Sequence, residues 1–139
     1  MATVENSLTQ YKNSIAAILA NNSGMARGAV QALAEQGLAG KVFVAGADAD
    51  LASIKDNVAG RQQFEVLKDI QPLAATAAQV AAKLAGGQKP AATQTVENGG
   101  AKIPTIATPV YAITKENLEE KIFKSGFHAR DAVYGGVKK

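Results

Sequence analysis

Short polar side chains follow two apolar stretches of this 139-residue chain, at the points where the stretches end. The first stretch is followed by Asn21, Asn22 and Ser23, and the second by Asp48 and Asp50. If the stretches are parallel strands of an α/β sheet, ligands are expected outside their carboxyl ends. Asn and Asp side chains make several directional hydrogen bonds to hydroxyl groups. This pattern predicts part of a pocket for a small, polar, uncharged ligand.

The elements that must position these residues alternate between strand and helix. Buried parallel strands are expected at residues 15–20 and 41–46, and a shorter strand at 64–67. Helices are expected at residues 4–12, 24–36, 50–58 and 69–85, and after Thr114. Ser23 is expected to cap the helix at 24–36, and Asp48 or Asp50 the next helix. The alternation predicts an α/β fold with a mainly parallel sheet.

The amphipathic helices have recognisable inward faces. The helix at 24–36 is expected to bury Ala26, Val30, Leu33 and Ala34. The helix at 69–85 places Ile70, Leu73, Ala77, Val80, Ala81 and Leu84 on one face. Residues 98–100 predict a turn, residues 93–96 a short strand, residues 105–113 an extended segment and residues 126–139 an irregular tail.

Composition narrows the functional class. One domain is expected at this length, with a core of small side chains, because 47% of the residues are hydrophobic but only 5% are aromatic. The net charge of +3 is spread along the chain, and the Lys138–Lys139 pair is expected to be a solvated tail, so no nucleic-acid partner is predicted. The absence of cysteine excludes disulfides and thiolate chemistry. No signal peptide or membrane-spanning run is predicted.

Enzymatic alternatives lack their essential groups. Asp48 and Asp50 form a D-x-D at a strand end, as in haloacid-dehalogenase-type phosphatases, but no further acidic pair follows outside a helix to hold magnesium. The loops NNSG and GADAD lack the G-x-G-x-x-G that cradles a dinucleotide, and their aspartates repel phosphate. The single histidine, His128, is expected to be a surface or packing residue. We therefore predict no enzyme, no cofactor and no metal site.

The order of segments nevertheless resembles a known family. The run NSIAAILANNSGMARGAVQALAEQGLAGKVFVAGADADLASIK resembles the C-terminal half of periplasmic sugar-binding proteins of the ribose, xylose and galactose type. The later segments FEVLKDIQPLAATAAQVAAKL, NGG and PTIATPVYAITKENLEEKIFKSGFH are similar to the same family in the same order. The similarity runs from about residue 4 to residue 128.

The resemblance implies a partial lobe. Members of the family have two α/β lobes, joined by three crossovers, that close on a sugar. By this resemblance, residues 4–68 correspond to βα units of the second lobe, in a three-layer, mainly parallel sheet flanked by helices. Residues 69–92 correspond to a helix returning to the first lobe, residues 93–128 to the final crossover and C-terminal helix, and residues 129–139 to a tail.

The same resemblance implies three ligand-binding positions. Asn22 matches an asparagine that bonds sugar hydroxyls, Asp48 an aspartate that accepts from two hydroxyls, and Lys68 a lysine that donates to the sugar. Without the resemblance, Lys68 reads as a solvated strand end and Asn22 as part of a turn. Ser23 departs from the aspartate common in the family, and Asp50 is expected to be structural.

The resulting hypothesis is a non-enzymatic module, or a fragment of one, that binds a D-xylose-like monosaccharide. Its implied partners are the membrane subunits of an ABC importer, and its implied location is the periplasm or the outer cell surface. The alternative is a truncated half-domain that binds no sugar but self-associates, with exchanged elements, or pairs with its missing half. In that case the apolar face of the helix at 69–85 is expected to form the contact.

Overall fold

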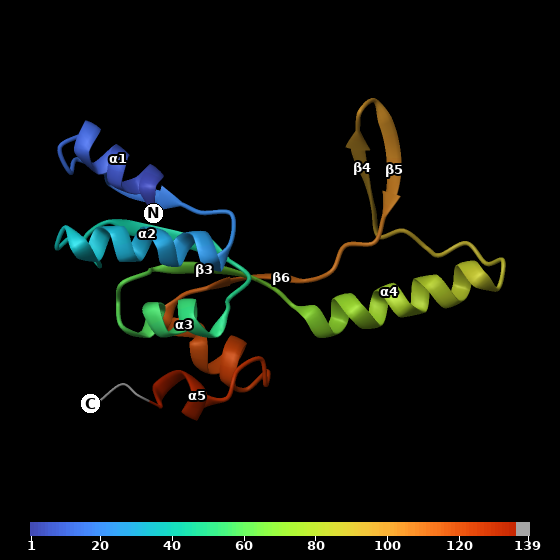
Figure 1. Cartoon of the computed structure of the whole chain (residues 1–139). Coiled ribbons are helices and arrows are strands. Elements are labelled where there is room, and N and C mark those ends of the chain that lie inside the picture. The colour runs from blue at the N-terminus through green and yellow to red at the C-terminus, as the bar shows by residue number, and fades with distance from the viewer. Residues whose placement is uncertain (136–139) are drawn as a thin grey trace. The chain divides into compact units, whose positions relative to one another are not determined.

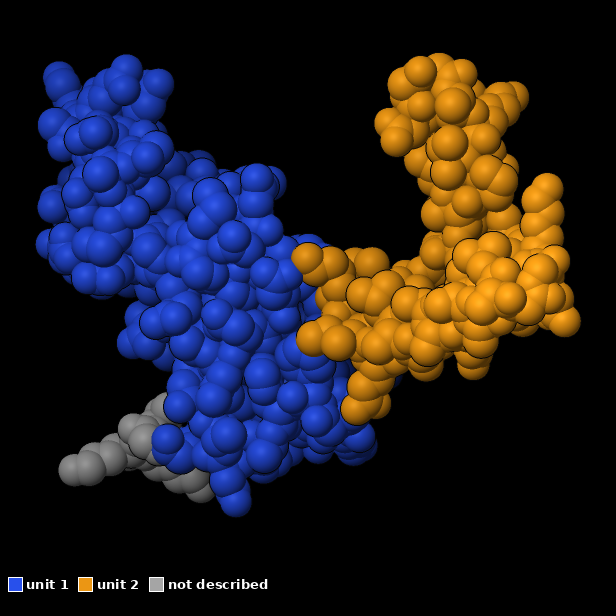
Figure 2. Space-filling model, turned by 45° about the vertical axis from the view of Figure 1, so that its right-hand side comes forward, with its two compact units in different colours: residues 1–67, 111–139 blue, residues 68–110 orange. Residues whose placement is uncertain are grey.

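We describe a computed structural model of the chain, covering residues 1–135. These residues belong to two compact units, which Figure 2 shows in different colours. Unit 1 comprises residues 1–67 and the C-terminal part from residue 111, and unit 2 comprises residues 68–110. Lys138 and Lys139, which are expected to form a solvated tail, lie outside the described residues.

Unit 1 is built on a sheet with flanking helices (Figure 1). Its elements are, in order, α1 (Ala2–Gln10), β1 (Ala17–Leu19), α2 (Ser23–Glu35), β2 (Phe43–Ala47), α3 (Leu51–Val58), β3 (Phe64–Lys68), β6 (Val110–Ile113), η1 (Lys115–Asn117), η2 (Glu119–Phe123) and α5 (Arg130–Tyr134). The strand order is β1-β2-β3-β6. Strand β2 pairs in parallel with both β1 and β3, with Ala17 opposite Phe43 and Ala45 opposite Phe64. The predicted parallel α/β arrangement is confirmed.

The hydrophobic core lies on one face of this sheet, beneath α2 and α3. Along β2 and β3, Val44 and Leu67 are buried, whereas their neighbours Phe43 and Val66 are not. This alternation follows from the two-residue period of a strand. One cluster joins Leu8 of α1 to α2 and β2, and a second joins α3, β3 and the C-terminal helices.

Several local predictions need correction. Strand β1 is an edge strand in the described chain, not a buried one, and Leu19 is 80% exposed. Ala34 of α2 is exposed, and Ala29 and Ala32 take the inward positions instead. The C-terminal tail is not irregular throughout, because residues 130–134 form α5.

Unit 2 consists of helix α4 (Ile70–Ala85) and the hairpin of β4 (Gln94–Asn98) and β5 (Ala101–Thr105). Gly99 and Gly100 both have positive φ, as a tight two-residue hairpin turn requires. The turn was expected, but strand β5 was not recognised in the sequence. Helix α4 matches its predicted span, and Asp69 caps it by accepting from the Gln71 amide. No residue of α4 is buried in the described structure.

None of the helices within residues 1–135 is both long enough and apolar enough to cross a membrane.

Gly46 of β2 offers a test of the core. A Cβ atom there would meet the Glu65 carboxylate, the Cβ of Ala26 and the Gln62 amide at less than ordinary contact distance. We expect Gly46→Ala to lower the free energy of unfolding by about 1–3 kcal/mol, because overpacking a filled core costs that much. Urea unfolding followed by circular dichroism measures the change.

The matched control is Gly28→Ala in α2, where the nearest atom beyond the helix lies at ordinary contact distance. We expect this change to raise stability by up to about 1 kcal/mol, because alanine is the better helix former. Equal effects of the two substitutions would contradict the packing described here.

Candidate functional site

The candidate site lies where strands β1 and β2 end and helices α2 and α3 begin. Asn22 is the N-cap of α2, and its Oδ1 accepts from the Met25 amide at 2.8 Å. The sequence-based assignment of Ser23 as this cap is wrong. Asn22 is the N-cap because its backbone is extended, whereas Ser23 is already the first helical residue. Asn22 is exposed and lies at the sheet edge.

Asp48 follows β2 directly and is exposed at the same edge. Its backbone N–H donates to the Val66 carbonyl of β3 at 2.8 Å, which continues the parallel ladder by one residue. Its φ of 97° then turns the chain sharply away from the strand. Because β1 and β2 are adjacent and parallel, their carboxyl ends share one edge. The structure therefore brings Asn22 and Asp48 to that edge from neighbouring loops, as predicted.

Asp50 has the structural role expected of it. Its Oδ1 accepts from the Ser53 amide at 2.7 Å and caps α3. Its backbone N–H donates to the Ser23 Oγ at 3.1 Å, so the loop after β2 is tied to the start of α2. Ser53 Oγ donates to the Ser23 carbonyl at 3.3 Å and adds a second tie. The two loops that carry Asn22 and Asp48 are thus held against each other.

A buried carboxylate underlies both loops. Glu65 of β3 is 0% exposed. Its two oxygens accept from Ser23 Oγ at 3.1 and 3.2 Å, from the Ala49 amide at 3.0 Å and from Gln62 Nε2 at 2.6 Å. Gly46 leaves the space that the carboxylate occupies. A buried carboxylate is tolerated only when it is hydrogen-bonded in this way.

Sequence reasoning missed both Ser23 and Glu65 as parts of this network. One signal for Glu65 was present, since it lies two residues before Leu67 in a strand and therefore faces the core with it. A carboxylate at such a position requires donors from other elements. Nothing in the local sequence indicates which loops supply them.

Lys68 is the last residue of β3 and the first residue of unit 2, and it is exposed. Asp48 and Lys68 each already make an interaction within the chain.

The sheet edge offers a mixed set of hydrogen-bonding groups. Asp48 supplies carboxylate acceptors, and Asn22 supplies an amide that donates and retains one lone pair beyond its capping bond. Such a set fits hydroxyl groups, which both donate and accept. Within the described residues, no group of three His, Asp or Glu side chains is placed to hold a metal ion.

Ionisable groups with shifted pKa values lie elsewhere. The hydrogen bond from Lys121 lowers the pKa of Glu120, and the same bond raises the pKa of Lys121. A side-chain hydrogen bond with Thr114 lowers the pKa of Glu116. All three belong to the short helices η1 and η2, and none is among the predicted site residues.

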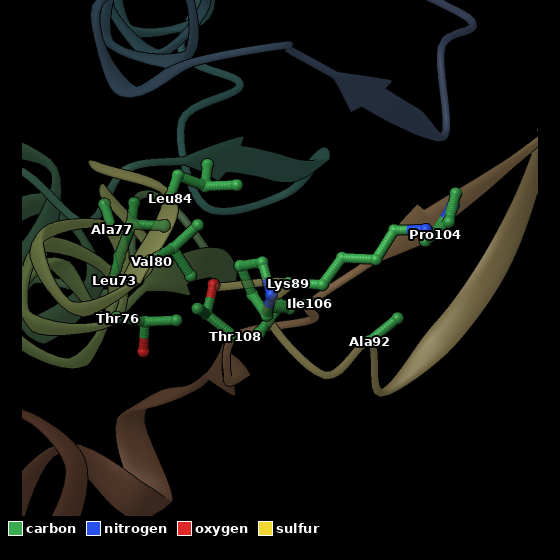
Figure 3. A pocket seen from close by; sticks show the side chains of 11 residues that line it. Leu73, Thr76, Ala77, Val80, Leu84, Lys89, Ala92, Pro104, Ile106 and Thr108 are labelled. Carbon is green, nitrogen blue, oxygen red and sulfur yellow. The ribbon is translucent and has the colours of Figure 1, made fainter. Parts of the chain in front are cut away.

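A cavity of about 590 Å³ in unit 2 has a different chemistry (Figure 3). Leu73, Val80 and Leu84 of α4 line one side of it, and Ile106 contributes from the segment after β5. Its lining includes no carboxylate and no carboxamide. Its polar side chains are Thr76, Thr108 and Lys89, and the rest of the lining is apolar. Because each sugar hydroxyl needs directional donors and acceptors, this lining suits a sugar less well than the sheet edge does.

Comparison with known proteins identifies the family. Residues 1–89 match the model of a periplasmic binding protein domain, which is more than half of the chain. The chain belongs to the periplasmic binding protein family. Its fold agrees with this membership: a carbohydrate transporter solute binding protein from Chloroflexus aurantiacus, solved with D-glucose, matches 94% of the chain at a TM-score of 0.83 and 31% identity.

Two curated relatives of this family are similar along nearly the whole chain. The D-xylose-binding periplasmic protein of Haemophilus influenzae is 42% identical over 131 residues, or 94% of this chain. That of Escherichia coli is 46% identical over 126 residues, or 90% of this chain. The chain spans only 40% and 38% of these relatives, so it corresponds to part of a periplasmic binding protein.

Substitutions of Asn22 separate its capping of α2 from its proposed contact with a ligand. We expect Asn22→Ala to lower the free energy of unfolding by about 1 kcal/mol, because the Met25 amide loses its acceptor. Asn22→Asp retains a capping oxygen and should keep the stability of the original chain while removing the amide donor. Chemical unfolding of the two variants side by side gives the comparison, and equal losses would show that Oδ1 is not the cap.

Proposed function

We propose that this chain is part of the substrate-binding component of an ABC sugar importer and that its ligand is D-xylose or a closely related monosaccharide. The observation that carries the proposal is the 42–46% identity to two D-xylose-binding periplasmic proteins over 90–94% of the chain. The placement of Asn22 and Asp48 at the carboxyl edge of adjacent parallel strands supports it. The role is binding and delivery, without catalysis.

Each proposed ligand residue has a distinct task. The Asp48 carboxylate accepts from two adjacent sugar hydroxyls, the Asn22 amide donates to a hydroxyl, and Lys68 donates as a cation from the end of β3. Ser23, Glu65 and Asp50 fix the loops but do not touch the ligand. In this proposal, the loops supply the contacts and the buried carboxylate fixes their geometry.

We further propose that residues 4–68 come from one lobe of the full-length protein and that residues 69–92 return toward the other lobe. The partner of the intact protein is the membrane part of the importer, and its location is periplasmic, as the names of the relatives indicate for those proteins. The chain's share of about two fifths of their length supports a partial lobe.

The affinity of the partial chain follows from the number of contacts. A net hydrogen bond contributes about 1 kcal/mol, and up to about 3 kcal/mol when one partner is charged. Association costs about 4 kcal/mol or more in lost freedom of motion. Three residues on one side of a sugar therefore leave little net free energy. Tight binding requires a second lobe to cover the other side.

A second candidate function is self-association without sugar binding, and two observations favour it. The apolar face of α4 is exposed, with Ile70 at 60% and Leu84 at 58%. Edge strand β1 is also open along Leu19. Exposed apolar faces and open strand edges of this kind promote association. This candidate and sugar binding are separated by the two experiments below.

For the sugar-binding proposal, we expect a dissociation constant of about 1 mM or weaker for D-xylose, which corresponds to about 4 kcal/mol or less. Ligand-observed saturation-transfer NMR on the purified chain measures it. Asp48→Asn should weaken binding about fivefold, because a neutral acceptor replaces a charged one. Asp50→Asn is the matched control, since asparagine also caps helices, and it should bind as the original chain does.

Micromolar affinity would overturn the claim that the chain is an incomplete site. Equal affinity in the Asp48 and Asp50 variants would remove Asp48 from the site.

For association, we expect sedimentation velocity at tens of micromolar to show dimers or larger species. Leu73→Lys combined with Leu84→Lys should restore the monomer, because the charges disrupt the apolar face of α4. Gln71→Lys with Gln79→Lys adds the same charge at exposed positions of the same helix and should leave the association intact. A well-folded monomer of the original chain at that concentration would dismiss this candidate.

A further inference from the structure

The turn after β2 has an unusual backbone. Asp48 and Ala49 are consecutive non-glycine residues with positive φ, at 97° and 54°. The left-handed region costs a non-glycine residue on the order of 1 kcal/mol or more. Neither residue is glycine, although glycine would remove that cost. Surrounding contacts must therefore hold this turn in place.

Both polar groups of the Ala49 backbone are held from different parts of the chain. Its N–H donates to Glu65 Oε2 at 3.0 Å. Its carbonyl lies 2.8 Å from His128 Nε2, a residue 79 positions later. A carbonyl oxygen only accepts, so Nε2 carries the hydrogen, as it does in the Nε2–H tautomer and in the imidazolium. Ala49 itself is 0% exposed.

The imidazole is in turn supported by its neighbour. The Phe127 ring meets the His128 ring edge to face, with centroids 4.7 Å apart. His128 is half-buried, and Val133 of α5 and Ile122 of η2 belong to the same core cluster as Ala49. The C-terminal segment is thus joined to the turn by a polar contact as well as by packing.

We propose that Glu65 and His128 are positioning residues for Asp48: they clamp the Ala49 peptide groups and hold the preceding carboxylate at the sheet edge in the orientation that contacts a sugar hydroxyl. The inference rests on the proposed function for its ligand, but the clamp itself is defined by the two contacts to Ala49. The sequence predicts His128 only as a surface or packing residue. The clamp gives this histidine a specific role.

Three variants of the full chain test the clamp. His128→Phe keeps a ring but removes the donor. His128→Gln restores a donor at a similar reach. The third variant combines His128→Phe with Ala49→Gly, because glycine adopts positive φ without being held.

The readouts are NMR measurements on the 15N- and 13C-labelled chain. His128→Phe removes the donor to the Ala49 carbonyl and leaves the bond from the Ala49 amide to Glu65. Because the turn opens more readily without the carbonyl contact, we expect the Ala49 amide to exchange with solvent about tenfold faster. The Cα shifts of Asp48 and Ala49 should move away from values typical of positive φ. His128→Gln should return both measurements to those of the original chain, and the glycine combination should return the Asp48 shift.

Unchanged exchange and shifts in His128→Phe overturn the clamp, and so does a failure of His128→Gln to restore them. A packing role alone predicts that Phe is tolerated and Gln is not. Titration with D-xylose separates this inference from the proposed function. Loss of the sugar-dependent Asp48 shift in His128→Phe supports the inference. The other outcome is that D-xylose never shifts Asp48 in the original chain, although His128→Phe speeds exchange of the Ala49 amide. That result overturns the proposed function and supports the clamp.

Discussion

The buried carboxylate of Glu65 is the interaction on which the sheet edge depends. It accepts hydrogen bonds from the first residue of α2, from the loop after β2 and from the segment before β3. Each donor fixes one loop, and Ser23 also accepts from the Asp50 amide, so the loops are fixed to each other. Loss of any one donor leaves a buried charge partly unsatisfied, which is costly. The strands bring Asn22 and Asp48 near one another, but this network determines their geometry.

The sequence predicted the elements more successfully than it predicted the contacts between them. The parallel strands and the span of α4 follow from local patterns, namely periodicity and short polar residues at element ends. The same patterns left the cap of α3 open between Asp48 and Asp50, and the structure has Asp50 there. The burial of β1 was predicted wrongly because an apolar run reads the same at an edge as in the middle of a sheet. Sequence alone does not say which neighbours a strand has.

The candidate site shows the same division. Asn22 and Asp48 lie where strand ends place them, and that much was predictable from the order of strands and loops. The inward hydroxyl of Ser23, the carboxylate of Glu65 and the imidazole of His128 depend on contacts across 42 and 79 positions of the chain. Contacts between residues so far apart in the sequence depend on the whole fold, so no local motif predicts them.

An exposed apolar helix face is unfavourable in a folded chain, and a partial chain accounts for it. The apolar face of α4 is exposed, and the chain spans about two fifths of its curated relatives. A helix with such a face is stabilised mainly by what packs on it. In the account proposed here, the remaining part of the longer protein supplies both the cover for this helix and the second side of the sugar site.

The central claim is that a monosaccharide contacts the carboxyl edge of β1–β3, and amide shift mapping on the labelled chain tests it most directly. With saturating D-xylose, the account predicts the largest shifts at Asn22, Asp48 and Lys68. It predicts none at the α4 residues that line the cavity, such as Leu73, Val80 and Leu84. Shifts confined to α4 would contradict it. So would an unchanged spectrum at D-xylose concentrations far above 1 mM, since about 1 mM is the tightest dissociation constant expected of the partial chain.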